Sequence, residues 1–120
     1  MPRNISFALT TEQFKNKTKT VTRRLGWQFL KDGDVLMGCK KCMGLKPGEK
    51  IERLGKIRVI SATREKLSDL LIDGAYGDDE AKKEGFPQMT GENFVNFFIQ
   101  EMKCSQDVEL TRIEYEYLID

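Results

Sequence analysis

The order of strand-like and helix-like segments restricts the fold of this chain more than any other feature of its sequence. Segments with a β pattern gather toward both ends of the chain. They cover residues 5–9, 19–24, 35–42, 51–63 and 108–118. Helical patterns fall mainly between them, without the strand–helix–strand rhythm of a parallel sheet. We therefore predict an α+β fold: a small mixed β-barrel or curved sheet of five to six strands with two or three short helices, its last strand returning to the first.

Capping residues mark where the helices are expected to begin. Thr10, with Gln13 three residues later, has the pattern of a capping box for a short helix. Asp78 or Asp79 is placed to cap a second helix, and Thr90 to cap a third. These signals predict short helices rather than long ones.

Apolar periodicity predicts which faces are buried. The last helical segment has apolar residues at i, i+3, i+4 and i+7, a stripe that favours a core over a ligand pocket. These residues are Val95, Phe98, Ile99 and Met102. In the strand over residues 51–63, Ile57, Val59 and Ser61 are expected on one face, and Gly55 is expected to mark a bulge.

The length of 120 residues suits a single domain, residues 1–120. No apolar run approaches the length of a membrane span, and the N-terminus has no apolar signal-peptide segment, so we expect a cytoplasmic protein.

The sequence has no metal-ligand cluster, phosphate-binding loop or dinucleotide fingerprint, and we expect no metal and no cofactor. The absence of histidine removes the usual general base, so catalysis would use Lys, Glu, Asp, Tyr, Cys or Thr.

Charge is distributed unevenly, although the net charge is only +1. Residues 1–64 carry 15 Lys/Arg and 5 Asp/Glu, a net of +10, whereas residues 65–120 carry 5 Lys/Arg and 14 Asp/Glu, a net of −9. The basic half is typical of a surface that binds polyanions. The alternative is that the two halves neutralise each other across the fold.

The three cysteines do not make a convincing site. Cys39 and Cys42 have the spacing of a metal knuckle or a redox pair, but only Cys104 remains to complete a zinc site. Cys39 also falls in a predicted strand, whereas redox cysteines of this spacing sit at a helix N-terminus. We interpret the thiols as buried or incidental and assign them no role.

Residues 15–24 form the most basic stretch, with five Lys/Arg, three threonines and no acid. On a strand, the side chains of alternate residues in this stretch would point to opposite faces and present cations and hydroxyls to an anionic or polar partner. The alternative is a solvated edge strand whose lysines discourage aggregation.

The segment Lys19-Thr-Val-Thr22-Arg-Arg24 resembles the core of the Gly-x-Lys-x-x-Thr-x-Arg motif of the ASCH family, a branch of the PUA-like β-barrels. The Gly-Asp-Val turn at residues 33–35 and the Asp-Glu-Ala-Lys-Lys-Glu-Gly-Phe segment at residues 79–86 also look like this family. Residues 23–27 and 43–49 resemble a subgroup common in phage and prophage genomes. The family glycine two residues before the lysine is Lys17 here. The resemblance extends over essentially the whole chain, and it implies a single ASCH/PUA-like domain over residues 1–120.

This resemblance implies a PUA-like barrel with a cleft between the barrel and the helical segment. The family is proposed to bind RNA or nucleotide-like ligands. One bacterial branch hydrolyses the acetyl amide of acetylcytidine, and its catalytic lysine, threonine and glutamate would fall on Lys19, Thr22 and Glu84. Other members are reported as ribonucleases.

The chemistry of these residues allows two interpretations. A desolvated Lys19 has a lowered pKa and can act as a base toward the Thr22 hydroxyl, with Glu84 positioning water and Arg24 clamping an oxyanion or phosphate. However, Lys19 and Thr22 face opposite sides of a regular strand, so both reach one cleft only if the strand bulges or the cleft wraps its end. Alternatively, Lys19 and Glu84 form an ordinary salt bridge between helix and strand.

Further basic and aromatic residues are candidates for ligand contacts. They are Arg24, Arg23, Lys17, Trp27, Lys40 and Lys41. Trp27 and Tyr76 have aromatic faces on which bases stack, while core packing is the alternative for Trp27. Lysines that contact phosphates would make binding sensitive to salt.

Three functional hypotheses follow. The first is a domain that recognises RNA, or a nucleotide-like small molecule such as a modified nucleoside. Its cleft would be lined by Lys19, Thr22, Arg24 and Glu84. The second is a metal-free amidohydrolase for acetylcytidine-like nucleosides, or a ribonuclease. The third is a phage accessory protein that binds a host protein through its acidic C-terminal half. The oligomeric state is left open by the sequence.

Overall fold

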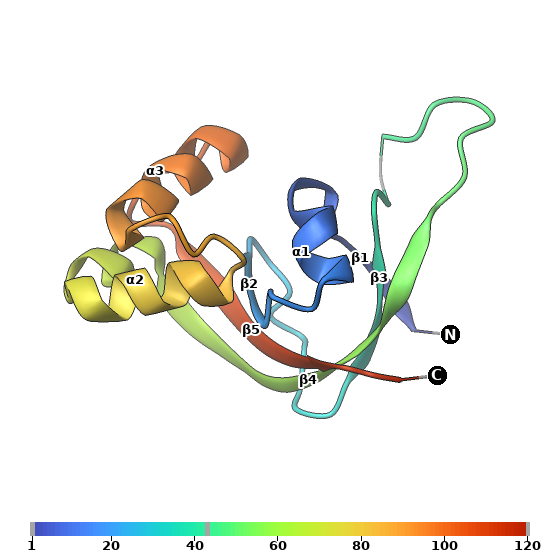
Figure 1. Ribbon diagram of the computed structural model, residues 1–120, viewed down its shortest axis with the longest axis horizontal. Coiled ribbons are helices and arrows are strands. Elements are labelled where there is room, and N and C mark those ends of the chain that lie inside the picture. Colours follow the sequence, from blue (N-terminus) through green and yellow to red (C-terminus); the bar gives the residue numbers. More distant parts are fainter. Residues whose placement is uncertain (1, 43, 120) are drawn as a thin grey trace.

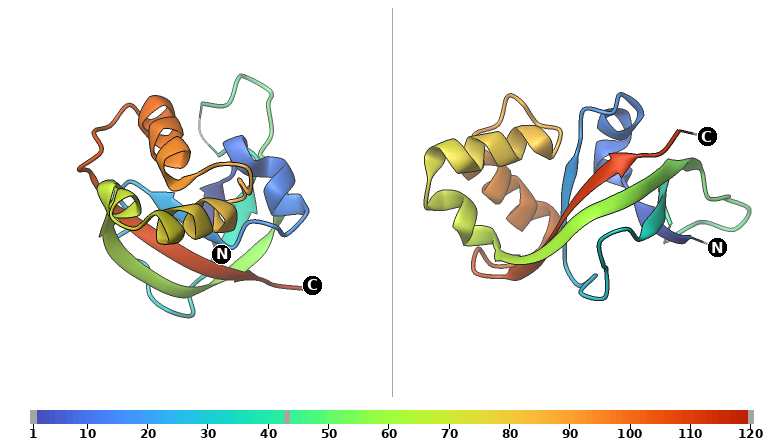
Figure 2. Two further views of the ribbon diagram at one scale, coloured as in Figure 1. Left: turned by 60° about the vertical axis from the view of Figure 1, so that its left-hand side comes forward. Right: turned by 90° about the horizontal axis from the view of Figure 1, so that it is seen from below.

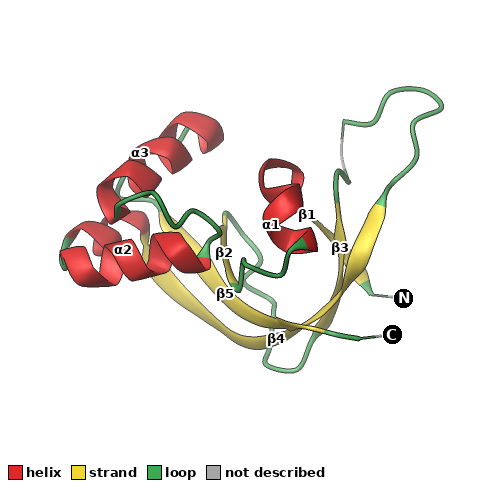
Figure 3. Ribbon diagram, in the orientation of Figure 1, coloured by secondary structure: helices red, strands yellow, loops and turns green. Residues whose placement is uncertain are grey.

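Five strands form one curled sheet that is open along one side (Figures 1 and 3). The computed structural model describes residues 2–42 and 44–119. The strands are β1 (Arg3–Ser6), β2 (Val21–Arg24), β3 (Val35–Cys39), β4 (Arg53–Lys66) and β5 (Glu109–Tyr117). The helices are α1 (Thr11–Lys15), α2 (Gly74–Lys83) and α3 (Gly91–Met102), with 3-10 turns η1 (Ala8–Thr10) and η2 (Leu67–Leu71). The predicted α+β class and small barrel-like architecture are confirmed.

The sheet is mixed, in the order β1-β3-β4-β5-β2. Strands β1 and β3 run parallel, and the other pairs are antiparallel. The expectation that the last strand returns to the first is wrong. Strand β5 forms hydrogen bonds with β4 on one side and β2 on the other, so it has no free edge for β1.

Two irregularities bend the long strand β4. Gly38 pairs with Gly55 but Cys39 pairs with Arg53, so the pairing shifts beside the glycine expected at a bulge. A second shift leaves Ile60 without an opposite residue. It reverses the inward face of the strand, so that Ala62 rather than the expected Ser61 packs toward the barrel core.

The apolar residues form two separate cores. The first lies inside the curled sheet under α1 and consists of Ile5, Phe7, Phe14, Leu30, Leu36, Ile57, Val59, Ile113 and Tyr115. The second joins the helices to the end of β5 and consists of Leu67, Leu70, Ala81, Phe94, Val95, Phe98 and Leu110. Helices α2 and α3 lie at one end of the molecule, and both chain termini lie at the other (Figure 2). The space between the two cores is where a cleft can form.

Thr10 precedes α1 as expected but does not cap it, and the start of α2 differs from the expected one. The Thr10 side chain makes no capping bond to α1, whereas the Thr11 hydroxyl donates to the Phe7 carbonyl at 2.9 Å. Helix α2 begins earlier than expected, because the Asp73 carboxylate accepts hydrogen bonds from the first-turn amides. Asp78 instead accepts a bond from the Gly91 amide at 2.9 Å and so joins α2 to α3.

The predicted cap of α3 is confirmed, since the Thr90 side chain accepts a hydrogen bond from the Asn93 amide. None of the helices in the described residues is long and apolar enough to cross a membrane.

Helices α2 and α3 approach closely through glycine. A Cβ added to Gly91 would lie 2.6 Å from the Gly77 Cα, and one added to Gly77 would overlap the Leu70 carbonyl oxygen. Only glycine fits at these two positions. This close contact fixes the position of α3 relative to α2.

Candidate functional site

A cavity of about 420 Å³ lies between the half-barrel and the helical end. Its walls come from the segment between β1 and η1, the region around β2, the end of α2, and α3. The lining residues are Ser6, Phe7, Ala8, Leu9, Thr10, Lys19, Thr22, Arg23, Arg24, Leu25, Trp27, Glu84, Phe86, Phe94, Phe97, Phe98 and Met102. This volume falls in the range of small-molecule sites in proteins.

The structure brings the four predicted cleft residues into this cavity: Lys19, Thr22, Arg24 and Glu84. Of the other candidates, Arg23 and Trp27 also line it. Lys17, Lys40 and Lys41 are not among the lining residues. Lys40 nevertheless lies next to the wall, because the Ser6 hydroxyl donates to its carbonyl.

Lys19 reaches the cavity because it precedes the strand. Strand β2 begins at Val21, so the alternation of faces expected over residues 19–24 does not extend to Lys19. The Tyr117 hydroxyl donates to the Lys19 carbonyl at 2.5 Å and holds this part of the backbone. The cleft therefore wraps the end of the strand, and Lys19 and Thr22 can both line it.

Glu84 is held in place as the C-terminal cap of α2. The Gly85 amide donates to the Lys82 carbonyl and the Phe86 amide to the Ala81 carbonyl, the two bonds of a Schellman motif. Gly85 has φ +101°, the conformation that this motif gives to glycine. The cap therefore sets the position of the Glu84 side chain.

The Lys19 ammonium satisfies this helix end. Its Nζ donates to the Glu84 carbonyl at 2.9 Å and to Glu84 Oε1 at 2.7 Å. The Thr20 amide also donates to the Lys83 carbonyl at 2.8 Å. A cation at a helix C-terminus is favoured by the helix dipole, whereas a carboxylate there needs a partner. The pair therefore joins α2 to the start of β2.

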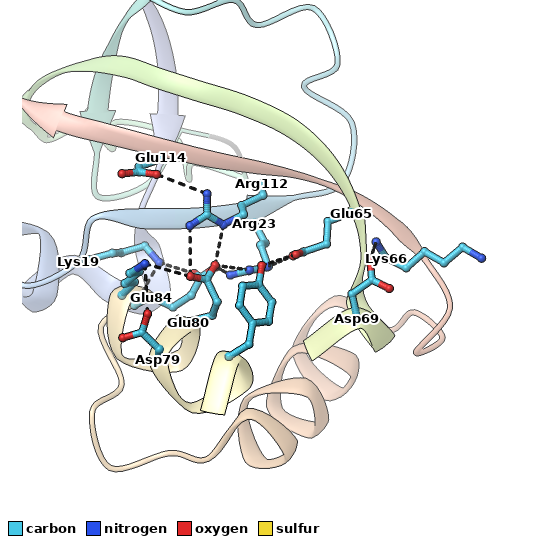
Figure 4. Close-up of polar contacts among 12 residues, drawn as sticks. Lys19, Arg23, Glu65, Lys66, Asp69, Asp79, Glu80, Glu84, Arg112 and Glu114 are labelled. Atoms are coloured by element: carbon cyan, nitrogen blue, oxygen red, sulfur yellow. Dashed lines mark hydrogen bonds and ion pairs between the residues drawn. The ribbon is translucent and has the colours of Figure 1, made fainter. Parts of the chain in front are cut away.

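Arg23 ties the same carboxylate into a buried network (Figure 4). Its Nη1 lies 3.0 Å from Glu84 Oε2, its Nη2 lies 2.5 Å from Glu80 Oε1, and its Nε lies 2.8 Å from Glu65 Oε1. Arg112 donates to both oxygens of Glu80, at 2.6 and 3.2 Å. The sequence predicts Arg23 as a ligand contact, but its guanidinium has all three nitrogens bound to carboxylates.

Part of the uneven charge is neutralised across the fold. Arginines of the basic half and glutamates of the acidic half meet within this buried network, and exposed pairs such as Arg58–Glu116 and Arg64–Glu109 add to the neutralisation. The spacing of Glu80 four residues before Glu84 is a sequence signal for one helix face, but nothing in the sequence indicates that Arg112 faces it.

Arg24 differs from its neighbours in having no carboxylate partner among the described residues. Its Nε donates to Thr22 Oγ1 at 3.0 Å, and its Cζ lies 5.0 Å from the centre of the Phe7 ring. It therefore contributes a positive charge to the cavity wall, beside a hydroxyl and an aromatic ring.

Burial lowers the pKa of Lys19 from its ordinary value, although Glu84 opposes this by attracting the charged form. A lysine with a lowered pKa can take up a proton from a substrate or a nucleophile. In the described residues, however, the Thr22 hydroxyl is hydrogen bonded to Arg24 and not to Lys19. The lysine–threonine contact of a Ser–Lys-type dyad is thus not formed in this structure.

Aromatic side chains form the opposite wall of the cavity. Phe86 lies 5.2 Å from Phe97 and 6.1 Å from Phe94, and Phe94 lies 6.1 Å from Phe98, measured between ring centres. The apolar stripe of α3 is predicted to be core, and this holds only in part. Phe98 belongs to the helical core but also lines the cavity. The apolar stripe gives no indication of Phe86 and Phe97 as cavity residues, because neither falls on it.

The two aromatic candidates for base stacking have different surroundings. Trp27 lines the cavity, packs against the barrel core and lies 5.5 Å from the Phe29 ring. Tyr76 lies on α2, where its hydroxyl donates to Glu65 Oε2 at 2.5 Å, and it is not among the lining residues. Trp27 therefore lies in the cavity, where a residue that stacks on a base would be needed, and it also makes the core contacts of the alternative interpretation.

Lys17 occupies the position where the ASCH motif has glycine. Its φ is +61°, in the left-handed region that glycine adopts without strain. The turn therefore has a backbone conformation that glycine would also adopt.

The cysteines are free thiols in this structure. Burial, followed by the neighbouring Cys42, raises the pKa of Cys39 to about 11. Among residues 2–42 and 44–119, no group of three or more His, Cys, Asp or Glu side chains is arranged to hold a metal ion.

Comparison with known proteins gives a similar fold. No protein-family model and no curated protein sequence matches this chain. Among solved structures, the crystal structure of protein EF3133 from Enterococcus faecalis V583, assigned to the DUF984 family, is similar with a TM-score of 0.66 and 14% sequence identity. The similar region covers 98% of this chain and 77% of that one. At this identity the similarity shows a shared fold.

Proposed function

We propose that the protein is an ASCH-type domain that recognises RNA or a modified nucleoside in the cavity lined by Lys19, Thr22, Arg24 and Glu84. One observation carries this proposal: polar side chains of the β2 region and a wall of phenylalanines line the same cavity. Aromatic walls bind unpaired bases by stacking, and polar groups read their edges. The resemblance of residues 19–24 to the ASCH motif supports the same function.

A thermal-shift screen tests this proposal, since a specific ligand stabilises the folded protein by mass action. The screen contains unmodified and modified nucleosides and short single-stranded RNAs. We expect at least one of them to raise Tm, and the shift to be lost in Phe97→Ala, which removes part of the aromatic wall. Phe29→Ala is the matched control, because Phe29 is exposed and lies outside the cavity lining.

Two results would contradict the proposal. One is a screen in which neither nucleosides nor RNA shift Tm at low salt, where phosphate contacts are strongest. The other is a shift of equal size in Phe97→Ala and the unchanged protein, which would put the ligand elsewhere.

A second candidate function is metal-free hydrolysis of an acetylcytidine-like amide, in which water is added to give the free amine and acetate. It is favoured by the presence of Lys19, Thr22 and Glu84 in one cavity and by the lowered pKa of Lys19. Chromatography of acetylcytidine incubated with the protein in a chelator tests it. Turnover that is lost in Thr22→Val would support a nucleophilic threonine, and turnover that persists would exclude that role.

A further inference from the structure

The polar end of the cavity offers more free hydrogen-bond donors than acceptors. Arg24 uses its Nε on Thr22 Oγ1, and its Nη1 and Nη2 have no partner among residues 2–42 and 44–119. The Thr22 hydroxyl hydrogen has no acceptor in this part of the chain either. Both oxygens of Glu84 already accept bonds, from Lys19 and Arg23. A ligand here is therefore expected to bring acceptor atoms.

The charge of this end points in the same direction. Lys19 and Arg23 are each paired with carboxylates, which leaves Arg24 as the cavity-lining cation without one in the described residues. Arginine keeps its charge under all ordinary conditions, and Arg24 is half-buried beside an aromatic ring. Among the described residues no buried side-chain nitrogen lacks a partner, so the free guanidinium nitrogens of Arg24 stay accessible, and an anion bound beside them would gain a charge-assisted contact.

The rest of the cavity is apolar. Ten of the seventeen lining residues are Ala, Leu, Met, Phe or Trp. A ligand that fills it needs a ring or another apolar body against α3, in addition to an anionic group near Arg24. A nucleotide has both features, whereas a nucleoside has only the first.

We propose that the ligand of this cavity is a nucleotide, whose phosphate is bound by the Arg24 guanidinium and the Thr22 hydroxyl while its base lies against the phenylalanine wall. This inference rests on the proposed function and narrows its ligand class. A guanidinium suits a phosphate because its donors match two phosphate oxygens at once. The phosphate belongs either to a free mononucleotide or to a nucleotide within RNA.

Calorimetric titration with matched ligands tests the inference. The ligands are cytidine, cytidine 5′-monophosphate, a cytidine pentanucleotide and phenyl phosphate, all at one ionic strength. We expect the monophosphate to bind about tenfold more tightly than cytidine, a difference in keeping with one charge-assisted contact. Arg24→Gln is expected to abolish this preference, because it weakens binding of the monophosphate more than binding of cytidine.

Further variants separate loss of binding from loss of fold. Arg24→Lys keeps the charge but not the paired donors, and is expected to retain only part of the preference. Thr22→Val removes the hydroxyl at nearly constant volume and is expected to weaken monophosphate binding more than cytidine binding. Arg58→Gln is the control, because Arg58 is half-exposed and pairs with Glu116 outside the cavity.

The outcomes distinguish this inference from the proposed function. Equal affinity for cytidine and its monophosphate, or a phosphate preference that survives Arg24→Gln, would overturn the inference and leave the nucleoside function standing. Binding of phenyl phosphate that depends on Arg24, without binding of either cytidine ligand, would reject both the nucleoside function and the nucleotide inference, and would leave only an anion site at Arg24. If none of the phosphate ligands binds, the inference is rejected. Tighter binding of the pentanucleotide than of the monophosphate would identify RNA as the source, and the reverse would identify a free nucleotide.

Discussion

Lys19 Nζ lies 2.7 Å from Glu84 Oε1, although the two residues are 65 positions apart and their side chains are only 3% and 4% exposed. The pair connects the start of β2 to the C-terminal end of α2, and so connects the half-barrel to the helical end. Because it lines the cavity, the same contact that holds the two parts together also shapes the candidate site.

Replacing Lys19 with Met is expected to lower the free energy of unfolding by about 3 kcal/mol, because it leaves part of the Glu84 charge buried without its partner. The substitution also removes a hydrogen bond to the carbonyl of Glu84, the C-cap residue of α2. Urea denaturation followed by circular dichroism measures the effect.

Lys15→Met is the matched control. Lys15 pairs with Glu52 at 3.8 Å, with both side chains about half exposed. Exposed pairs contribute less than about 1 kcal/mol, so the control should be close to the unchanged protein. Similar losses in the two variants would mean that burial does not determine the strength of the Lys19–Glu84 contact.

Two glycines of α2 give a test of the close helix contact. Gly77→Ala is expected to destabilise the protein by about 2 kcal/mol, since the new Cβ overlaps the Leu70 carbonyl and lies 3.1 Å from the Gly91 Cα. Gly74→Ala, in the same helix, meets nothing within 4 Å and should be neutral or stabilising by up to about 1 kcal/mol. Thermal unfolding of the two variants measures the difference. If both gained stability, helix propensity rather than packing would control this position.

The sequence is sufficient to predict the elements of the fold but not their pairing. Alternation and capping residues act locally, so the strand at residues 108–118 and the cap at Thr90 are found within one or two residues. The position of β5 beside β2 depends on hydrogen bonds between residues about ninety positions apart, for which the sequence has no local signal. A bulge such as that at Ile60 also changes which side chains face inward without altering the composition of the strand.

The candidate site was predictable where a motif identified it. The motif at residues 19–24 and the glutamate at residue 84 fall in one cavity, yet strand alternation places Lys19 and Thr22 on opposite faces. The structure resolves this because β2 starts after Lys19. The network of Arg23, Glu80 and Arg112 is not predictable in this way, because an exposed and a buried charge look alike in a sequence.

Thiol reactivity should distinguish Cys39 from the other two cysteines. Burial and the neighbouring Cys42 raise the pKa of Cys39 to about 11, so only about one molecule in a thousand carries this thiolate at pH 8. Titration with Ellman's reagent at pH 8 is expected to label Cys42 and Cys104 in the folded protein, and Cys39 only after denaturation. A Cys39→Ser variant identifies the slow thiol. The prediction is wrong if this variant loses a fast-reacting group instead.

Glu80 is expected to make the stability of the protein dependent on acid pH. Burial alone would raise its pKa, but hydrogen bonds and charge from Arg112 and Arg23 outweigh burial and lower the pKa to about 2. An unfolded glutamate has a pKa of about 4.3, so the folded state binds fewer protons than the unfolded state between these values. The contribution of Glu80 is therefore complete above about pH 5 and is lost as the pH falls toward 2.

The comparison of Glu80→Gln with the unchanged protein isolates this contribution, because the two share all other titrating groups. Their difference in unfolding free energy, measured by urea denaturation from pH 7 to pH 2.5, should be largest at neutral pH and should shrink steadily below about pH 4. Glu101→Gln is the control, at an exposed position of α3 that makes no ion pair among the described residues. A Glu80→Gln difference that stays constant across this range would show that the carboxylate contributes through packing or neutral hydrogen bonds, and not through its charge.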